Sequence, residues 1–196
     1  MEKINILSPA KINLSLDIIS KREDNFHNIR SYIQIIDFFD EISIEIDDND
    51  SNISLDCSEK KISTNENLAY IAAYKFLEVF NIKSGLKIKI KKNIPMGAGM
   101  GGGSSNAAAV LIGLSKIFKI EDFKKILVLG EELGSDIPLF LYSRSACISQ
   151  KGQVVNLVKN PPKLNYFLVM PRLEISSKKS YRNWKGNEEY VKNFHK

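Results

Sequence analysis

The sequence predicts an α+β fold, in which helices pack on a mostly antiparallel or mixed sheet. Alternating apolar and polar residues, which are typical of half-buried strands, recur through the first third of the chain. Helical stripes and further short strands follow, and the two kinds of element are mixed rather than strictly alternating. The chain has 196 residues, enough for one domain of ordinary size and part of a second.

The composition is that of an ordinary globular protein, with 43% hydrophobic and 26% charged residues. No apolar run reaches the roughly 18 residues that a membrane span needs. The two cysteines lie far apart and only two histidines occur, so we expect reduced thiols, no zinc site and a cytoplasmic protein. A strand pattern begins near Ile4, which leaves no room for a targeting peptide.

Strands are predicted wherever the period is two. Residues 12–18 alternate in this way, which places Lys11 and Asn13 together on the polar face of one strand. Ile42, Ile44 and Ile46 mark a second strand, and residues 86–90 mark a third. Shorter strands are expected at residues 146–149, 154–158 and 166–170.

Helices are predicted at three places. Thr64 is the expected N-cap of the first, which runs to about Phe80 and carries a core-facing stripe, namely Leu68, Ala72, Phe76 and Phe80. The second covers residues 107–118 and the third residues 121–133. Gly134 suits a left-handed residue that ends the third helix.

A glycine-rich segment joins the third strand to the second helix. Five of the eleven glycines fall between residues 97 and 103. Glycine allows positive φ and close approach of a ligand to the main chain, and a helix start offers unpaired N–H groups. The segment is therefore predicted to bind phosphate, with Ser104 and Ser105 adding hydroxyl groups. It is neither a Walker A loop nor a dinucleotide fingerprint, because it lacks the Gly-Lys-Ser/Thr ending and the distant acidic residue.

Other polar segments have two interpretations each. Lys11 is either a solvated charge or a functional lysine. Asp136, after Gly134, lies either at a pocket edge or at the N-cap of a short helix. Residues 22–27 form either a surface turn or part of a site. The basic residues 87–92 alternate with apolar ones, which favours the solvent-exposed face of a strand over a nucleic-acid-binding surface. The net charge of +5 nevertheless leaves an anionic partner as an alternative.

Taken together and in this order, Pro9-Ala10-Lys11-Ile12-Asn13-Leu14, the Asp24–His27 loop, residues 95–108 and Gly134-Ser135-Asp136-Ile137-Pro138 resemble the GHMP kinase superfamily. Within it, the chain is most similar to the kinases of non-mevalonate isoprenoid synthesis. The resemblance implies a fold like domain 2 of ribosomal protein S5. It also implies that ATP, with Mg²⁺, phosphorylates the 2-hydroxyl of the cytidine-diphosphate-linked sugar alcohol 4-diphosphocytidyl-2-C-methyl-D-erythritol.

The resemblance also implies roles for residues of this chain. Lys11 and Asp136 would flank the acceptor hydroxyl as the catalytic pair. Phe26 and His27 would hold cytosine on one side, and Tyr181 would stack on its opposite face. Asn13 would lie near the sugar alcohol, and Ser177 near the diphosphate or ribose. The residues implied to bind ATP are Pro95, Met96, Gly97, Ala98, Gly99, Met100, Gly101, Gly102, Gly103, Ser104 and Ser105.

Two departures from the family pattern matter. Asn25 and Phe26 replace the usual Gly-Tyr, and asparagine tolerates the left-handed conformation that glycine would supply. No third glycine-rich motif follows Asp136. We therefore expect a nucleotide-binding domain at residues 1–160 and the start of a truncated second domain at residues 161–196. The alternatives are a nucleotide-binding remnant without turnover and a basic RNA-binding module; a second chain completing the fold is an open question.

Overall fold

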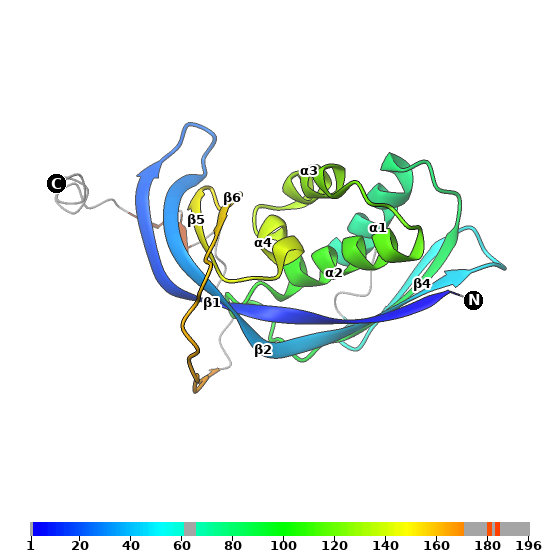
Figure 1. The fold of residues 1–196 in the computed structure, drawn as a ribbon, viewed down its shortest axis with the longest axis horizontal. Coiled ribbons are helices and arrows are strands. Elements are labelled where there is room, and N and C mark those ends of the chain that lie inside the picture. Colours follow the sequence, from blue (N-terminus) through cyan, green and yellow to red (C-terminus); the bar gives the residue numbers. More distant parts are fainter. Residues whose placement is uncertain (1, 61–65, 171–179, 182, 185–196) are drawn as a thin grey trace.

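The computed structural model describes residues 2–60, 66–170, 180, 181, 183 and 184. Within that part of the chain, six strands form one sheet and helices cover one of its faces (Figure 1). The strands are β1 Lys3–Lys21, β2 His27–Asp47, β3 Ile53–Cys57, β4 Gly85–Lys91, β5 Ala146–Gln150 and β6 Val154–Leu157. The helices are α1 Leu68–Val79, α2 Gly102–Ile117, α3 Phe123–Leu133 and α4 Ile137–Tyr142.

The long strand β2 organises the sheet. It pairs antiparallel with β1 from end to end, and on its other side with β4 and β5 at separate intervals. The order is β3-β4-β2-β5-β6, in which only β3 and β4 are parallel among these pairs. The predicted α+β class and mixed sheet are therefore confirmed.

The main core lies between the sheet and helices α1 and α2. Ile44 of β2 and Phe76 of α1 are fully buried there, together with Val110 and Leu114 of α2. The stripe predicted for the first helix is confirmed at its centre, because Ala72 and Phe76 are fully buried while Leu68 and Phe80 are half-buried. Burial of such side chains is the main source of the stability of the fold.

Three predicted boundaries need correction. The helix predicted from residue 107 begins at Gly102, because Gly101 takes the left-handed conformation at its N-cap and the first turn absorbs the remaining glycines. Gly134 has φ 173°, so it is extended rather than left-handed and leads straight toward α4. Asn67 caps α1 by accepting from Ala69 N, whereas the predicted cap Thr64 lies outside the described residues.

The predicted strand at residues 166–170 is wrong. This segment belongs to no ladder within the described part of the chain. Its alternation is real, because Tyr166 and Leu168 pack against a small cluster around Ala10 and Met100 while Phe167 is 93% exposed. The alternation thus reflects one half-buried side of the segment and not a strand of the sheet. The division of the chain at residue 160 stays a prediction.

Candidate active site

The glycine-rich segment forms an arc between β4 and α2. Gly97, Gly99 and Gly101 have φ of 67°, 70° and 71°, values that residues with a side chain rarely adopt. Lys11 N donates to Met100 O at 3.0 Å, which fixes the end of the arc against β1. The glycines are therefore required by the backbone conformation of this loop.

The phosphate-binding prediction concerns the N-terminus of α2. Gly101 is the N-cap, and no side chain caps the helix, so the N–H groups of its first turn are available to a ligand. A Cβ on Gly103 would meet no atom within 4 Å, and the same holds for Gly99. The loop thus has open space beside both glycines.

Two residues of the loop direct their side chains inward. Met100 is 7% exposed and packs with Ala10, while Ser105 is 1% exposed and its Oγ accepts from Ser8 Oγ at 2.7 Å. The side chains of these two residues are therefore not exposed to a ligand. Ser104 is half-buried and is the serine of the pair that lies nearer the open side.

Lys11 is buried beside this loop, with 8% of its surface exposed. Its Nζ donates to Asn13 Oδ1 at 2.5 Å, and Asn13 Nδ2 donates to Ser31 Oγ at 2.7 Å. The predicted shared face of Lys11 and Asn13 is therefore confirmed. Burial lowers the pKa of Lys11, and the negative charge of Asp136 partly opposes that effect.

Asp136 occupies the N-cap position of α4, but its side chain makes no capping hydrogen bond. Its position is thus that of a cap, while its carboxylate stays available to a ligand. Within the described residues, Lys11 and Asp136 form no direct ion pair, although Asp136 acts electrostatically on the pKa of Lys11. The two groups therefore share one neighbourhood, as the kinase interpretation requires.

An aromatic cluster lies next to this pair. His27 is 7% exposed; its ring stacks on Tyr181 with centroids 5.7 Å apart and forms a T-shaped contact with Trp184. Burial raises the pKa of Tyr181, and Asp136 adds to the effect. Phe26 is 52% exposed and lies free of this stack. The predicted left-handed Asn25 is confirmed at φ 63°.

The hairpin between β5 and β6 adds residues that the sequence did not single out. Lys151 Nζ lies 5.4 Å from the centre of the Phe26 ring. A Cβ on Gly152 would lie 3.7 Å from Asp136 Oδ1. This turn therefore contacts both the aromatic and the acidic side of the site. The predicted site residue Ser177 lies outside the described residues.

The basic stretch of β4 is the wet face of a strand, as predicted, except at Lys92. Lys87 and Lys91 pair with Asp47 and Glu41 at 2.9 and 2.7 Å. The sheet face thus carries compensated charge. Lys92 instead turns inward to a buried polar network, which the sequence did not predict.

No helix among the described residues is long and apolar enough to cross a membrane. In the same part of the chain, no group of three His, Cys, Asp or Glu side chains is arranged to hold a metal ion.

Known proteins indicate which family this chain resembles. Residues 67–144 match the family described as the GHMP kinases N terminal domain. Curated relatives named 4-diphosphocytidyl-2-C-methyl-D-erythritol kinase include one from Clostridium perfringens, 46% identical over 178 residues, which are 89% of this chain and 61% of the relative. Another, from Caldicellulosiruptor saccharolyticus, is 43% identical over 88% of this chain and 60% of its own length.

Solved structures give the same result. The crystal structure of a 4-(cytidine 5'-diphospho)-2C-methyl-D-erythritol kinase aligns with a TM-score of 0.71 and 34% identity, over 81% of this chain and 56% of the other. A homoserine kinase from Cytophaga hutchinsonii, 18% identical, shares the fold with a TM-score of 0.69, over 100% of this chain and 65% of its own. The chain thus spans about 61% of the length of the first of these curated relatives. The chain carries the N-terminal domain of the GHMP kinases.

Proposed function

We propose that this chain supplies the nucleotide-binding and proton-transfer groups of a kinase acting on 4-diphosphocytidyl-2-C-methyl-D-erythritol. ATP donates a phosphoryl group to the 2-hydroxyl of this acceptor. The observation that carries the proposal is the meeting of three segments. A Cβ on Gly101 would lie 3.3 Å from Lys11 Cγ and 2.6 Å from Phe140 Cζ, so the glycine loop, β1 and α4 are in contact where Lys11 and Asp136 share one neighbourhood.

Asp136 acts as the general base in this proposal. Its carboxylate is not used as a helix cap, so it is available to take the proton of the acceptor hydroxyl. Lys11 stabilises the alkoxide that develops, because a buried cation interacts strongly with a nearby anion. The hydrogen bond to Asn13 holds the ammonium group in place during this step.

ATP fits the loop because the first turn of α2 presents uncapped N–H groups beside open space. These groups orient the phosphates in line with the acceptor, which is the main demand of phosphoryl transfer. Mg²⁺ neutralises phosphate charge and favours oxygen ligands. Ser104 is the hydroxyl of this loop that we assign to that region.

The cytidine end of the acceptor is assigned to the aromatic cluster. Phe26 offers an exposed ring face for stacking, and Tyr181 with His27 forms the opposite wall. Because Tyr181 stacks directly on His27, cytosine would lie beside this pair or displace it. We assign the reaction to the cytoplasm, where ATP is available.

Phosphorus NMR of the chain with ATP, Mg²⁺ and the acceptor tests the proposal. We expect ADP and a new phosphomonoester, and we expect Asp136→Asn to abolish the product while leaving ATP affinity within about twofold, because an amide cannot accept the proton. ATP binding without product would favour the alternative of a nucleotide-binding protein without turnover. Failure to bind ATP would refute the proposal.

A further inference from the structure

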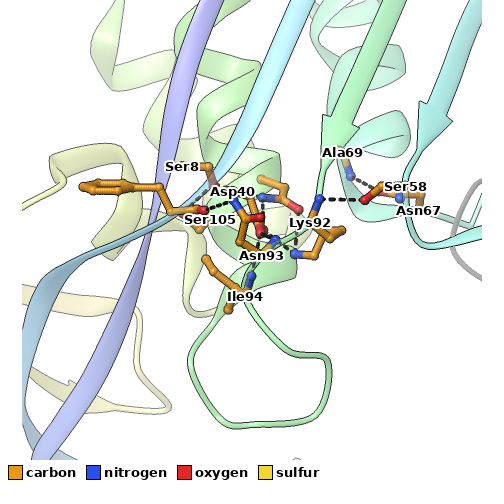
Figure 2. A network of polar contacts seen from close by, with 11 residues as sticks. Ser8, Asp40, Ser58, Asn67, Ala69, Lys92, Asn93, Ile94 and Ser105 are labelled. Atoms are coloured by element: carbon orange, nitrogen blue, oxygen red, sulfur yellow. Dashed lines mark hydrogen bonds and ion pairs between the residues drawn. The ribbon is translucent and has the colours of Figure 1, made fainter. Parts of the chain in front are cut away.

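A buried polar network connects the two ends of the glycine loop. Asp40 of β2 is fully buried, and both its oxygens are used. Oδ1 accepts from the main-chain N–H groups of Asn93 and Ile94 at 2.7 and 2.8 Å. Oδ2 accepts from Lys92 Nζ and, at 2.8 Å, from Asn106 Nδ2. Figure 2 shows Asp40 beside Lys92, Asn93 and Ile94.

The partners of Asp40 flank the loop in sequence. Asn93 and Ile94 immediately precede residues 95–105, and Asn106 immediately follows them. Ser8 of β1 extends the contact, because its Oγ donates to Ser105 Oγ at 2.7 Å and accepts from Asn106 Nδ2 at 3.0 Å. One carboxylate therefore holds both ends of the loop against the sheet.

Lys92 brings a charge under the start of α2. A Cβ on Gly102 would lie 3.0 Å from Lys92 Nζ, so the ammonium group lies against the first residue of the helix. A cation is unfavourable at the positive end of a helix dipole unless an anion compensates it. Asp40 supplies that anion, and Asn106 Oδ1 accepts a further hydrogen bond from Lys92 Nζ at 3.1 Å.

Stability alone does not explain such an arrangement. Burial of an ion pair costs desolvation, and well-packed apolar residues often replace buried pairs without loss of stability. Buried polar groups do fix one conformation when every member has a partner, as here for both oxygens of Asp40. A loop whose N–H groups bind phosphate gains affinity when its conformation is fixed beforehand.

We propose that Asp40 is a positioning residue, which holds both ends of the glycine loop so that its N–H groups are set for the phosphates of ATP. The inference rests on the proposed function. It adds a residue of β2, remote from the loop in sequence, to the determinants of nucleotide affinity.

The test combines ATP titration calorimetry with amide hydrogen exchange of the full chain. Asp40→Asn keeps one oxygen but turns an N–H₂ group toward two donors, Lys92 and Asn106. We expect ATP affinity to fall about tenfold, the size of losing one hydrogen bond to a charged group. Exchange should quicken at the amides of residues 96–103 and stay unchanged in β4.

Asp47→Asn is the matched control, because Asp47 lies on the same strand and pairs with a lysine of β4, Lys87, at 2.9 Å. It should leave ATP affinity and loop exchange unchanged. Ser8→Ala is the milder variant if Asp40→Asn does not fold. It removes one hydroxyl from the network and should weaken ATP about threefold to fivefold, within the usual value of a neutral hydrogen bond.

Unchanged ATP affinity and loop exchange in Asp40→Asn and Ser8→Ala would overturn the inference while leaving the proposed function intact. Faster exchange throughout β4 and α2 in both variants would also overturn it, since that result indicates a general structural role. Absence of ATP binding by the unaltered chain would overturn the proposed function, and this inference with it.

Discussion

Gly103→Val separates the binding role of the glycine loop from its structural role. Gly103 is exposed in the first turn of α2, and an added Cβ would meet no atom within 4 Å. Glycine and valine differ by less than about 1 kcal/mol in helix propensity. The free energy of unfolding should therefore change by no more than about 1 kcal/mol.

The same side chain would occupy the space assigned to a phosphate. Displacing the phosphate from one main-chain N–H removes a hydrogen bond to a charged group, worth about 1.5–3 kcal/mol. ATP affinity should then fall roughly tenfold to a hundredfold. Calorimetric titration with ATP and thermal unfolding of the same samples measure the two effects.

Gly101→Ala is the informative comparison. Gly101 has φ +71°, and its Cβ would lie 2.6 Å from Phe140 Cζ. The left-handed conformation costs roughly 1–2 kcal/mol and overpacking about 1–3 kcal/mol, so this variant should lose about 2–5 kcal/mol of stability.

If Gly103→Val binds ATP as tightly as the unaltered chain does, that result would refute the assignment of this loop to phosphate binding.

Two further predictions concern the acceptor side. Phe26→Ala should weaken binding of cytidine diphosphate about tenfold, because stacking a base on an aromatic ring is worth roughly 1–3 kcal/mol. Calorimetry should show no change in the affinity for ATP. Equal losses of affinity for both ligands would contradict the assignment of Phe26 to cytosine binding. Lys11→Met should raise the free energy of unfolding at neutral pH, because burial lowers the pKa of Lys11 and its charged form is penalised in the folded state. As the pH rises through the lowered pKa toward the unfolded value of 10.5, Lys11 loses its proton in the folded state first, and the stability gained by the variant shrinks. Urea unfolding at pH 7 and pH 10 measures this difference in unfolding free energy. A difference that stays constant between the two pH values would show that the charge of Lys11 is not the cause.

The backbone conformation of the glycine loop could be predicted from the sequence, because a high density of glycine indicates positive φ. Gly97, Gly99 and Gly101 lie where φ is positive, and their density in the sequence reflects that conformation directly. The face of Lys11 and Asn13 was predictable for a similar reason, since strand period depends only on neighbouring residues. The start of α2 at Gly102 was missed because glycine is a poor helix former, so the first turn had no helical signature in the sequence.

The network of Asp40 had no local signature. Asp40 is 52 residues from Lys92, and Ser8 is 98 residues from Asn106, so neither pairing follows from spacing along an element. The basic stretch 87–92 as a whole predicted an exposed Lys92, although this residue follows Lys91 directly and so shares the parity of Ile88 and Ile90. Ile88 and Ile90 are buried in β4, and Lys92, one residue past the end of the strand, also turns inward.

One contact ties the phosphate end of the site to the acceptor end. The ring of Phe140 occupies the space that a side chain at residue 101 would need. Phe140 lies on α4, whose N-cap is Asp136, so any displacement of the helix by a bulkier residue 101 would also move the proposed base. Glycine is therefore required at residue 101 for two reasons: the N-cap of α2 is left-handed, and α4 approaches the loop closely there. Because α4 has only six residues, the position of Asp136 relative to the glycine loop depends on the packing of Phe140 against Gly101.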